Sequence, residues 1–212
     1  MKKFALLIII LGLGFGAWQL LATKPDGSTP QAVVTPDTST DTPPKEITDK
    51  KIAVLNELVT ISFKGFGPGK VHNGSFTTIK SALGYTDIAL TGTITVSMDS
   101  LASDNEKLTE HLKSSAFFDV VKYPTATFVP KNITGADAQG AEMTGAMTIH
   151  GITKNITFPV QYKKVIPAPN VKMAYTESYV STFTLNMKEF GINQTFANET
   201  IELTVTVPII NK

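Results

Sequence analysis

The chain has 212 residues, 42% of them hydrophobic, and a formal net charge of +1 with a sequence pI near 7.9. This balance gives no electrostatic reason to expect nucleic acid as a partner. All 19 basic residues are lysines, which excludes the bidentate arginine fork that usually clamps carboxylates and phosphates. The absence of cysteine excludes disulfides, thiol catalysis, cysteine-bound metals and a cysteine-borne lipid anchor.

Residues 1–22 are predicted to be a membrane anchor or an export signal. Met1, Lys2 and Lys3 precede an uncharged run over residues 4–21, which would extend about 27 Å as a hydrophobic helix. The run is long for the h-region of a cleaved signal peptide and marginal for a hydrocarbon core of about 30 Å. Because lysines favour the cytoplasmic side, both alternatives place the rest of the chain in the periplasm or outside the cell. An anchor would make the cytoplasmic membrane a partner through residues 4–21.

Residues 23–50 are predicted to be a disordered linker rich in proline and threonine. The segment has no aromatic residue and scarcely a large aliphatic one, so it cannot bury enough surface to offset the entropy lost on ordering. A flexible linker of this length spans on the order of 30 Å. We therefore expect residues 51–212 to form a single domain, because no second linker follows.

The first three strands of this domain are predicted over residues 58–66, 71–81 and 86–98. Alternation of apolar and polar side chains marks them, as in Val59, Ile61 and Phe63 of the first strand. A period of two residues is typical of a strand with one buried face.

A short helix is expected after the third strand. Ser103 and Glu106 have the spacing of a capping box, in which each side chain satisfies a backbone N–H that the helix leaves unpaired. Leu108 and Leu112 then lie at i and i+4, which predicts one apolar stripe on the helix.

Two adjacent aromatic rings, Phe117 and Phe118, follow the helix. Tyr123 and Pro124 end any helical structure and return the chain to an extended conformation. We expect the helix and the two rings to close one region of the fold, beside the opening of an internal tunnel if one is present. Asp119 is expected to serve a local turn rather than catalysis.

Five further strands complete the pattern, over residues 125–133, 141–149 and 153–163, then a strand ending near residue 187 and a last one over residues 201–209. The last strand is the clearest, because Ile201, Leu203 and Val205 alternate with Glu202 and Thr204. Eight short antiparallel strands close into a barrel or form two packed sheets. An eight-stranded barrel leaves room for side chains or one slender ligand, and the composition alone leaves both architectures open.

Four segments, TVSMDSL, LTEHLKSSAFFDVVKYPTATF, GAMTIHGITKNITFPV and MKEFGIN, together resemble the YceI-like family of exported bacterial proteins. The resemblance covers about residues 52–210, with the motifs in the family's order and spacing. It implies an all-β fold, an eight-stranded antiparallel lipocalin-like barrel with one short helix. It also implies an apolar tunnel that holds a polyisoprenoid, such as an isoprenoid lipid or quinone, and no catalytic activity. One departure is Met187-Lys188 before EFGI, where the family often has arginine.

The candidate ligand-binding side chains are the large apolar residues expected on the inner faces of the strands, together with the aromatic pair. A tunnel for a prenyl chain needs such side chains, because a buried polar group without a partner costs about 1–3 kcal/mol. The alternative is that they simply fill a closed core. The candidates are Phe63, Phe76, Ile94, Val96, Phe117, Phe118, Phe128, Met147, Phe158, Phe183 and Leu203.

The sequence gives little support for a metal site or an enzyme. His72, His111 and His150 fall on separate elements without short ligand spacing, and neither a G-x-S-x-G motif nor a Gly-rich phosphate loop occurs. No cofactor is expected besides a bound isoprenoid lipid or quinone. The alternative function is an exported carbohydrate-binding or adhesion module, which predicts a filled core and exposed aromatic rings. The sequence also leaves a homodimer open.

Overall fold

The computed structural model describes residues 24–35, 52–85, 90–135, 140–164, 177–193 and 198–211. The anchor or signal predicted over residues 1–22 lies outside these ranges. Among the helices of the described ranges, none is both long enough and apolar enough to cross a membrane.

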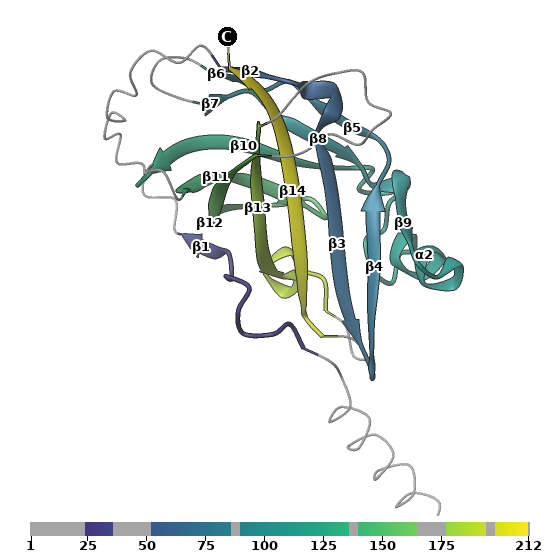
Figure 1. Ribbon diagram of the computed structural model, residues 1–212. Coiled ribbons are helices and arrows are strands. Elements are labelled where there is room, and N and C mark those ends of the chain that lie inside the picture. The colour runs from purple at the N-terminus through teal and green to yellow at the C-terminus, as the bar shows by residue number, and fades with distance from the viewer. Residues whose placement is uncertain are drawn as a thin grey trace, which may run out of the picture.

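The described residues form strands, one α-helix and three short 3₁₀ turns (Figure 1). The strands are β1 Val33–Thr35, β2 Ile52–Val54, β3 Thr60–Gly67, β4 Lys70–Phe76, β5 Ile79–Ser81, β6 Gly84–Tyr85, β7 Leu90–Thr91, β8 Ile94–Ser97, β9 Leu101–Ser103, β10 Thr125–Thr134, β11 Ala141–Ile149, β12 Ile152–Lys164, β13 Glu177–Asn186 and β14 Thr200–Asn211. The helix is α2 Glu106–Lys113, and the 3₁₀ turns are η1 Asn56–Leu58, η2 Met98–Ser100 and η3 Met187–Phe190.

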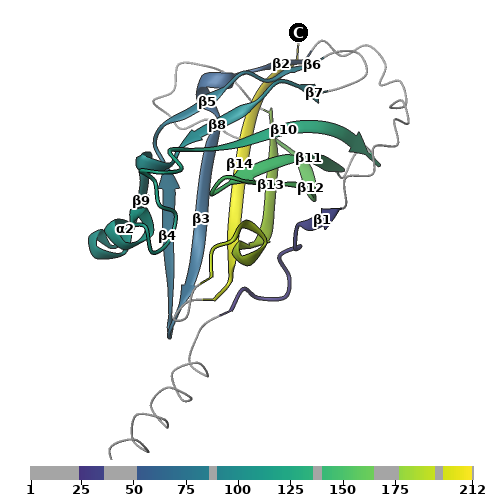
Figure 2. The ribbon, with the colours of Figure 1, turned by 180° about the vertical axis from the view of Figure 1, so that it is seen from behind.

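A single antiparallel sheet curves around the core as a half-barrel (Figures 1 and 2). Its strands follow the order β5-β8-β10-β11-β12-β13-β14-β3-β4-β9, with β1 added to β12 and β2 added to β14. The predicted all-β antiparallel class with one short helix is therefore confirmed. The predicted number of strands is wrong, because the pairing path contains ten strands rather than eight.

The difference in strand number has a local cause, because one expected strand breaks in two and a further strand, β9, forms where none was expected. The strand expected over residues 71–81 breaks at Thr77 and Thr78 into β4 and β5, and the chain after β8 turns through η2 before it pairs again as β9. The bent segments pair with each other, β4 with β9 and β5 with β8. The two ends of the pairing path are consequently linked by the chain rather than by strand pairing.

Two glycines allow aromatic rings to lie directly on a neighbouring strand. A Cβ added at Gly74 would lie 2.2 Å from the ring of Phe63, and one at Gly145 would lie 2.3 Å from the ring of Phe128. Real Cβ atoms do not approach other atoms so closely. Glycine is therefore required at both positions for the rings to pack as they do.

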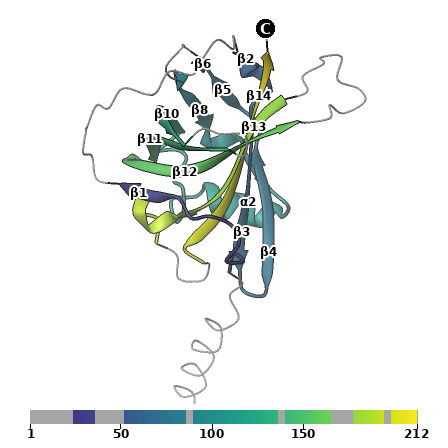
Figure 3. The ribbon, with the colours of Figure 1, turned by 60° about the vertical axis from the view of Figure 1, so that its left-hand side comes forward.

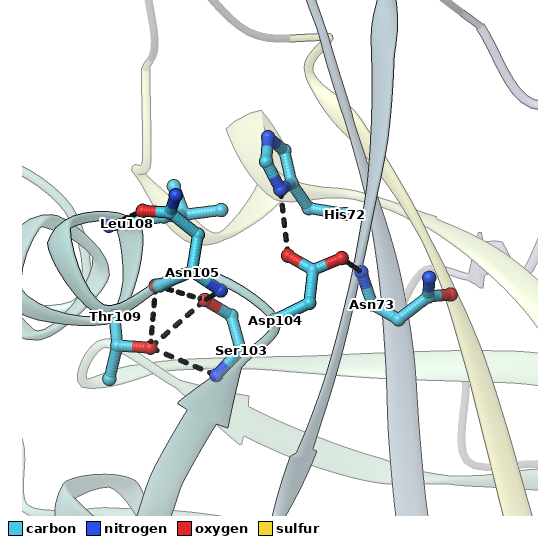
Figure 4. Close-up of polar contacts among 7 residues, drawn as sticks. All are labelled: His72, Asn73, Ser103, Asp104, Asn105, Leu108 and Thr109. Carbon is cyan, nitrogen blue, oxygen red and sulfur yellow. Dashed lines mark hydrogen bonds and ion pairs between the residues drawn. The ribbon is translucent and has the colours of Figure 1, made fainter.

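Helix α2 begins at Glu106, and its N-cap is Asn105 rather than the predicted Ser103. The Oδ1 of Asn105 accepts a hydrogen bond from the backbone N–H of Leu108 at 2.9 Å (Figure 4). Ser103 is still part of β9, and its backbone N–H donates to Oγ1 of Thr109. The capping-box prediction is wrong because Ser103 is still paired with Gly74 of β4, so the N-cap lies two residues later, at Asn105. The predicted apolar stripe is confirmed, since Leu112 is buried and Leu108 packs against the core.

The turn before the helix is tied to β4 by Asp104. Its Oδ1 lies 2.8 Å from Nδ1 of His72, and its Oδ2 accepts from the backbone N–H of Asn73 at 2.9 Å (Figure 4). The hydrogen bond from Asn73 and then the contact with His72 lower the pKa of the Asp104 carboxyl. This exposed pair fixes the position of α2 beside the sheet.

In the N-terminal strap, the name used here for residues 24–35, residues 29–35 are attached to the sheet, so the predicted disordered linker over residues 23–50 is wrong for this part. Strand β12 pairs with β13 only over residues 161–164, and the strap occupies the seam below that point (Figure 3). On one side β1 pairs with residues 155–157 of β12. On the other side Ala32 N–H donates to the Thr184 carbonyl at 2.8 Å, and Thr184 N–H donates to the Pro30 carbonyl at 2.7 Å.

Side chains add to this attachment. Thr29 Oγ1 donates to Oε2 of Glu202 at 2.7 Å, and Lys64 Nζ lies 2.7 Å from Oε1 of the same carboxylate. Ala32 belongs to the buried core. The strap is ordered because the edges of β12 and β13 on the two sides of the seam supply hydrogen-bond partners for its backbone. The composition of the strap does not indicate these hydrogen bonds.

Candidate functional site: an apolar cavity

The half-barrel encloses a cavity of about 430 Å³. Its wall is built mainly from apolar side chains that alternate along β8 and β10 to β14, with Met98 and Phe118 contributed by the connections. Strand alternation explains this wall, because every second side chain of a curved sheet points to its concave face. An apolar enclosure of this size is within the range of small-molecule sites, about 300–1,000 Å³.

Most of the sequence-predicted side chains line the cavity. These residues are Phe76, Ile94, Val96, Phe118, Phe128, Met147, Phe158, Phe183 and Leu203. Their binding role remains a prediction, but the structure brings them together around one space. The rings of Phe158 and Phe183 stack at 4.4 Å between centroids and 10° between planes, and Phe128 lies 5.4 Å from Phe158.

Phe63 and Phe117 do not line the cavity. Phe63 is buried on β3 with its ring over Gly74, and its centroid lies 5.8 Å from that of Phe76. Phe117 packs against Phe118 at 4.7 Å between centroids and against His111 at 6.2 Å. Both side chains pack against rings that line the cavity. Apolar periodicity alone cannot distinguish a side chain that lines the cavity from one that packs behind the lining.

The two ends of the cavity differ in burial. One end, here called the phenylalanine end, is formed by Met98, Phe118, Ile149 and Met187, which are all buried. Three of these residues lie where strands or their 3₁₀ extensions meet that edge, and Phe118 comes from the segment after α2. Phe118 therefore closes this end of the cavity, with Phe117 packed against it, whereas no residue of α2 lines the cavity.

The opposite end, here called the tyrosine end, carries Tyr162 and Tyr179 on the paired ends of β12 and β13. Tyr162 is 37% exposed although it lines the cavity, so the cavity reaches the surface here. The expectation that Phe117 and Phe118 lie beside the opening is wrong, because the antiparallel strands place them at the other end. Sequence reasoning also missed both tyrosines as site residues, although Tyr162 continues the alternation of Phe158 and Val160 on β12.

A hydrogen bond to Glu177 sets the protonation of Tyr162. This bond, together with burial and the charge of the carboxylate, raises the pKa of the Tyr162 phenol to about 12. Tyr162 therefore stays a neutral hydrogen-bond donor at physiological pH. The Oε2 of Glu177 is buried and has no hydrogen-bond partner.

Within the described residues, no group of three histidine, cysteine, aspartate or glutamate side chains could hold a metal ion. The three histidines lie apart, beside Asp104 for His72, Phe117 for His111 and Tyr123 for His150. Asp119 adopts a φ of 46° in the turn after the helix, and its carbonyl accepts from the N–H groups of the two residues before Pro124.

Comparison with known proteins decides the family. The model of the YceI-like domain matches residues 51–209. The chain belongs to the YceI-like family. Among its relatives, a UPF0312 protein of Pseudomonas putida is 33% identical over 109 residues, which cover 51% of this chain and 56% of the relative. A UPF0312 protein of Pseudomonas aeruginosa is 29% identical over 116 residues, covering 54% and 59%. The match thus spans little more than half the length of these relatives.

Solved structures share the fold of this YceI-like protein. Burkholderia cenocepacia BcnA is 16% identical with a TM-score of 0.62 over 75% of this chain and 100% of its own. A Campylobacter jejuni YceI protein is 22% identical with a TM-score of 0.52 over 66% and 84%. A polyisoprenoid binding domain from Saccharophagus degradans is 7% identical with a TM-score of 0.55 over 77% and 100%. At these identities the likeness concerns the fold alone.

Proposed function

We propose that this YceI-like protein binds an isoprenoid lipid or isoprenoid quinone in the apolar cavity, and that it sequesters or transports this lipid. The observation that carries the proposal is the cavity of about 430 Å³, lined by apolar side chains and exposed at one end. A prenyl chain fits such a wall because it has no polar groups that would lose their partners on burial.

The expected gain in free energy is sufficient for binding. Burial of about ten methylene equivalents at ~0.8 kcal/mol each contributes roughly 8 kcal/mol before ordering costs. That free energy corresponds to a dissociation constant near 1 μM, and a longer buried chain binds more tightly. Methionines in the wall, Met98, Met143, Met147 and Met187, suit an irregular ligand because their side chains adapt in shape.

The polyisoprenoid binding domain of Saccharophagus degradans supports this proposal, since its fold is shared by this chain. The apolar run over residues 4–21 supports export, and we propose that the domain acts in the cell envelope outside the cytoplasmic membrane, tethered or secreted.

The alternative, a carbohydrate-binding or adhesion module, predicts a filled core and exposed aromatic rings. The described domain instead contains a cavity, and the only aromatic residue among its exposed large hydrophobic side chains is Tyr162, at the cavity opening. These observations favour lipid over carbohydrate.

Organic extraction of the full chain purified from its native envelope, followed by mass spectrometry, tests the proposal. We expect one isoprenoid lipid to copurify per chain. Val205→Trp should abolish copurification because Val205 lines the cavity, whereas Thr204→Trp, its neighbour on the other face of β14, should leave it intact. Empty extracts from the unmodified chain, with no stabilisation by added polyprenol, would contradict lipid binding.

A further inference from the structure

We propose that the N-terminal strap is a movable closure of the cavity wall, and that the bound lipid enters and leaves sideways, between β12 and β13, when the strap detaches. The part of the wall concerned is the seam, formed by residues 152–160 of β12 and residues 181–186 of β13. This inference rests on the proposed function, because it assigns a route to the ligand of the same cavity.

The two strands at the seam are not paired with each other. Their register ends at Gln161 and Val180, and beyond that point β12 and β13 run apart, with β1 lying along β12 (Figure 3). Backbone hydrogen bonds join neighbouring strands of a sheet. At the seam the strap supplies these bonds instead, to residues 155–157 on one side and to Thr184 on the other.

Side chains at both edges of the seam line the cavity. The rings of Phe158 on β12 and Phe183 on β13 both belong to its wall, and they stack across the seam at 4.4 Å between centroids. Without the strap, the seam would be held by this ring stack and by the bond from the Ser181 hydroxyl to the Pro159 carbonyl. These contacts are made by side chains, which can change rotamer while the strands keep their places.

The position of the seam suits an elongated lipid. Along β13 it extends from Ser181, next to the paired tyrosine end, to Asn186, which precedes Met187 of the phenylalanine end. An opening there would expose the cavity along its length. A lipid that entered only at the tyrosine end would instead have to move lengthwise past the whole apolar wall.

The strap is held by much shorter pairing than the strands beside it. Strand β1 pairs with β12 only over residues 33–35, whereas β13 pairs with β14 over residues 177–186. Val33 is 59% exposed, although Ala32 is buried and Val34 packs against the core. Segments with short pairing and few buried side chains open locally at a lower free energy than the rest of a sheet. We therefore expect the strap to detach while the strands behind it stay paired.

The start of the strap is fixed by Thr29, whose Oγ1 donates to Oε2 of Glu202 on β14 at 2.7 Å. The carboxylate is buried, and Lys64 binds its other oxygen. Neither Thr29 nor Glu202 lines the cavity. Removal of the Thr29 hydroxyl should therefore loosen the strap without changing the surface that contacts the lipid.

A disulfide between the strap and β12 tests the closure, because the chain has no cysteine of its own. Val33 and Thr157 are directly opposed in the register, and the Cα spacing of opposed residues, about 4.5–5.5 Å, allows a disulfide. The delipidated full chain with Val33→Cys and Thr157→Cys is mixed with radiolabelled geranylgeraniol, and its uptake is followed by rapid gel filtration. Oxidation should slow uptake about tenfold or more, and reduction should restore the rate.

The matched control is Thr182→Cys with Thr204→Cys, which joins β13 to β14 at opposed residues whose hydroxyls lie 3.1 Å apart. Its uptake should be the same in both redox states, because these two strands are not expected to separate. Equal uptake by the oxidised and reduced strap variant would overturn the closure and leave entry at the tyrosine end. Equal slowing in the oxidised control would also overturn it.

Thr29→Val should have the opposite effect to the disulfide. With the bond to Glu202 removed, we expect the Ala32 N–H to exchange with deuterium about tenfold faster and geranylgeraniol to be taken up faster. Thr182→Val, which removes a hydroxyl bonded to Thr204, is the matched control and should change neither rate. Faster exchange with unchanged uptake would overturn the sideways route. No uptake by the unmodified chain would contradict the proposed function itself, so the two failures are distinguishable.

Discussion

The two ends of the cavity are built by different means. At the phenylalanine end the chain leaves the β pattern, forms α2 and inserts Phe118, and the turn that carries it is held by backbone bonds from Phe118 to Leu112 and from Val120 to Lys113. At the tyrosine end Tyr162 and Tyr179 lie on the paired ends of β12 and β13, and Tyr162 is 37% exposed. The comparison indicates that the first end contributes stability, whereas the second is available for contact with a ligand.

The largest expected difference is in unfolding free energy. Phe118→Ala removes a buried ring and should destabilise the protein by about 3–5 kcal/mol, as large-to-small core substitutions do. Tyr162→Ala removes a ring that is 37% exposed and should cost about 1 kcal/mol. Urea denaturation of both variants measures the difference, and equal losses would show that the two ends are not distinct in packing.

A second, smaller effect concerns the wall between the ends. Gly145→Ala places a methyl group where the Phe128 ring now lies, and should destabilise the fold by about 1–3 kcal/mol while it pushes that ring toward the cavity. The amount of lipid that copurifies with this variant should also fall. Gly65→Ala is the matched control, because a Cβ there meets nothing within 4 Å. If both alanine variants retain stability and lipid equally, the close packing of Phe128 does not shape the cavity.

The smallest effect is confined to the protonation of one side chain at the tyrosine end. In a spectrophotometric titration Tyr162 should ionise at a pKa of about 12, and Glu177→Gln should bring that value down toward 10. Because the folded pKa is the higher one, the stability contributed by this phenol is complete below about pH 10 and is lost as pH rises toward 12. Tyr162→Phe assigns the signal, and an unchanged titration in Glu177→Gln would mean that the carboxylate does not hold the phenol.

Much of the fold could be predicted because strand alternation is a local pattern. The alternation around residues such as Ile94, Val96 and Leu203 indicates which face of the strand is buried, whichever strands lie next to it. The bends at Thr77 and at η2 depend instead on how the curved sheet continues past them. The position of the helix cap depended on the pairing of β9 with β4, which extends the strand to Ser103.

The candidate site was predictable only where it is apolar. Phe158 and Phe183 follow from periodicity, but Phe63 fits the same pattern and does not line the cavity, and neither does Phe117 of the aromatic pair. Glu177 carries no signal of its own in the sequence, because a single acidic residue at the start of a strand is normally solvated. Its position next to Tyr162 follows from the register of β12 with β13, which only the structure supplies.

The strap would limit how far the domain could lie from a membrane that held residues 4–21. Because Thr29 and Pro30 are fixed to the sheet, the chain between Leu21 and Thr29 can extend at most about 29 Å, far less than the whole segment 23–50 would allow. Residues 24–29 lead away at the end of the half-barrel opposite the C-terminus (Figure 1). If a membrane held residues 4–21, the β3–β4 hairpin would therefore be the part of the domain nearest to it, and the tyrosine end would face away from it. In that arrangement a fluorophore at Lys70 should lie nearer the bilayer than one at Glu142.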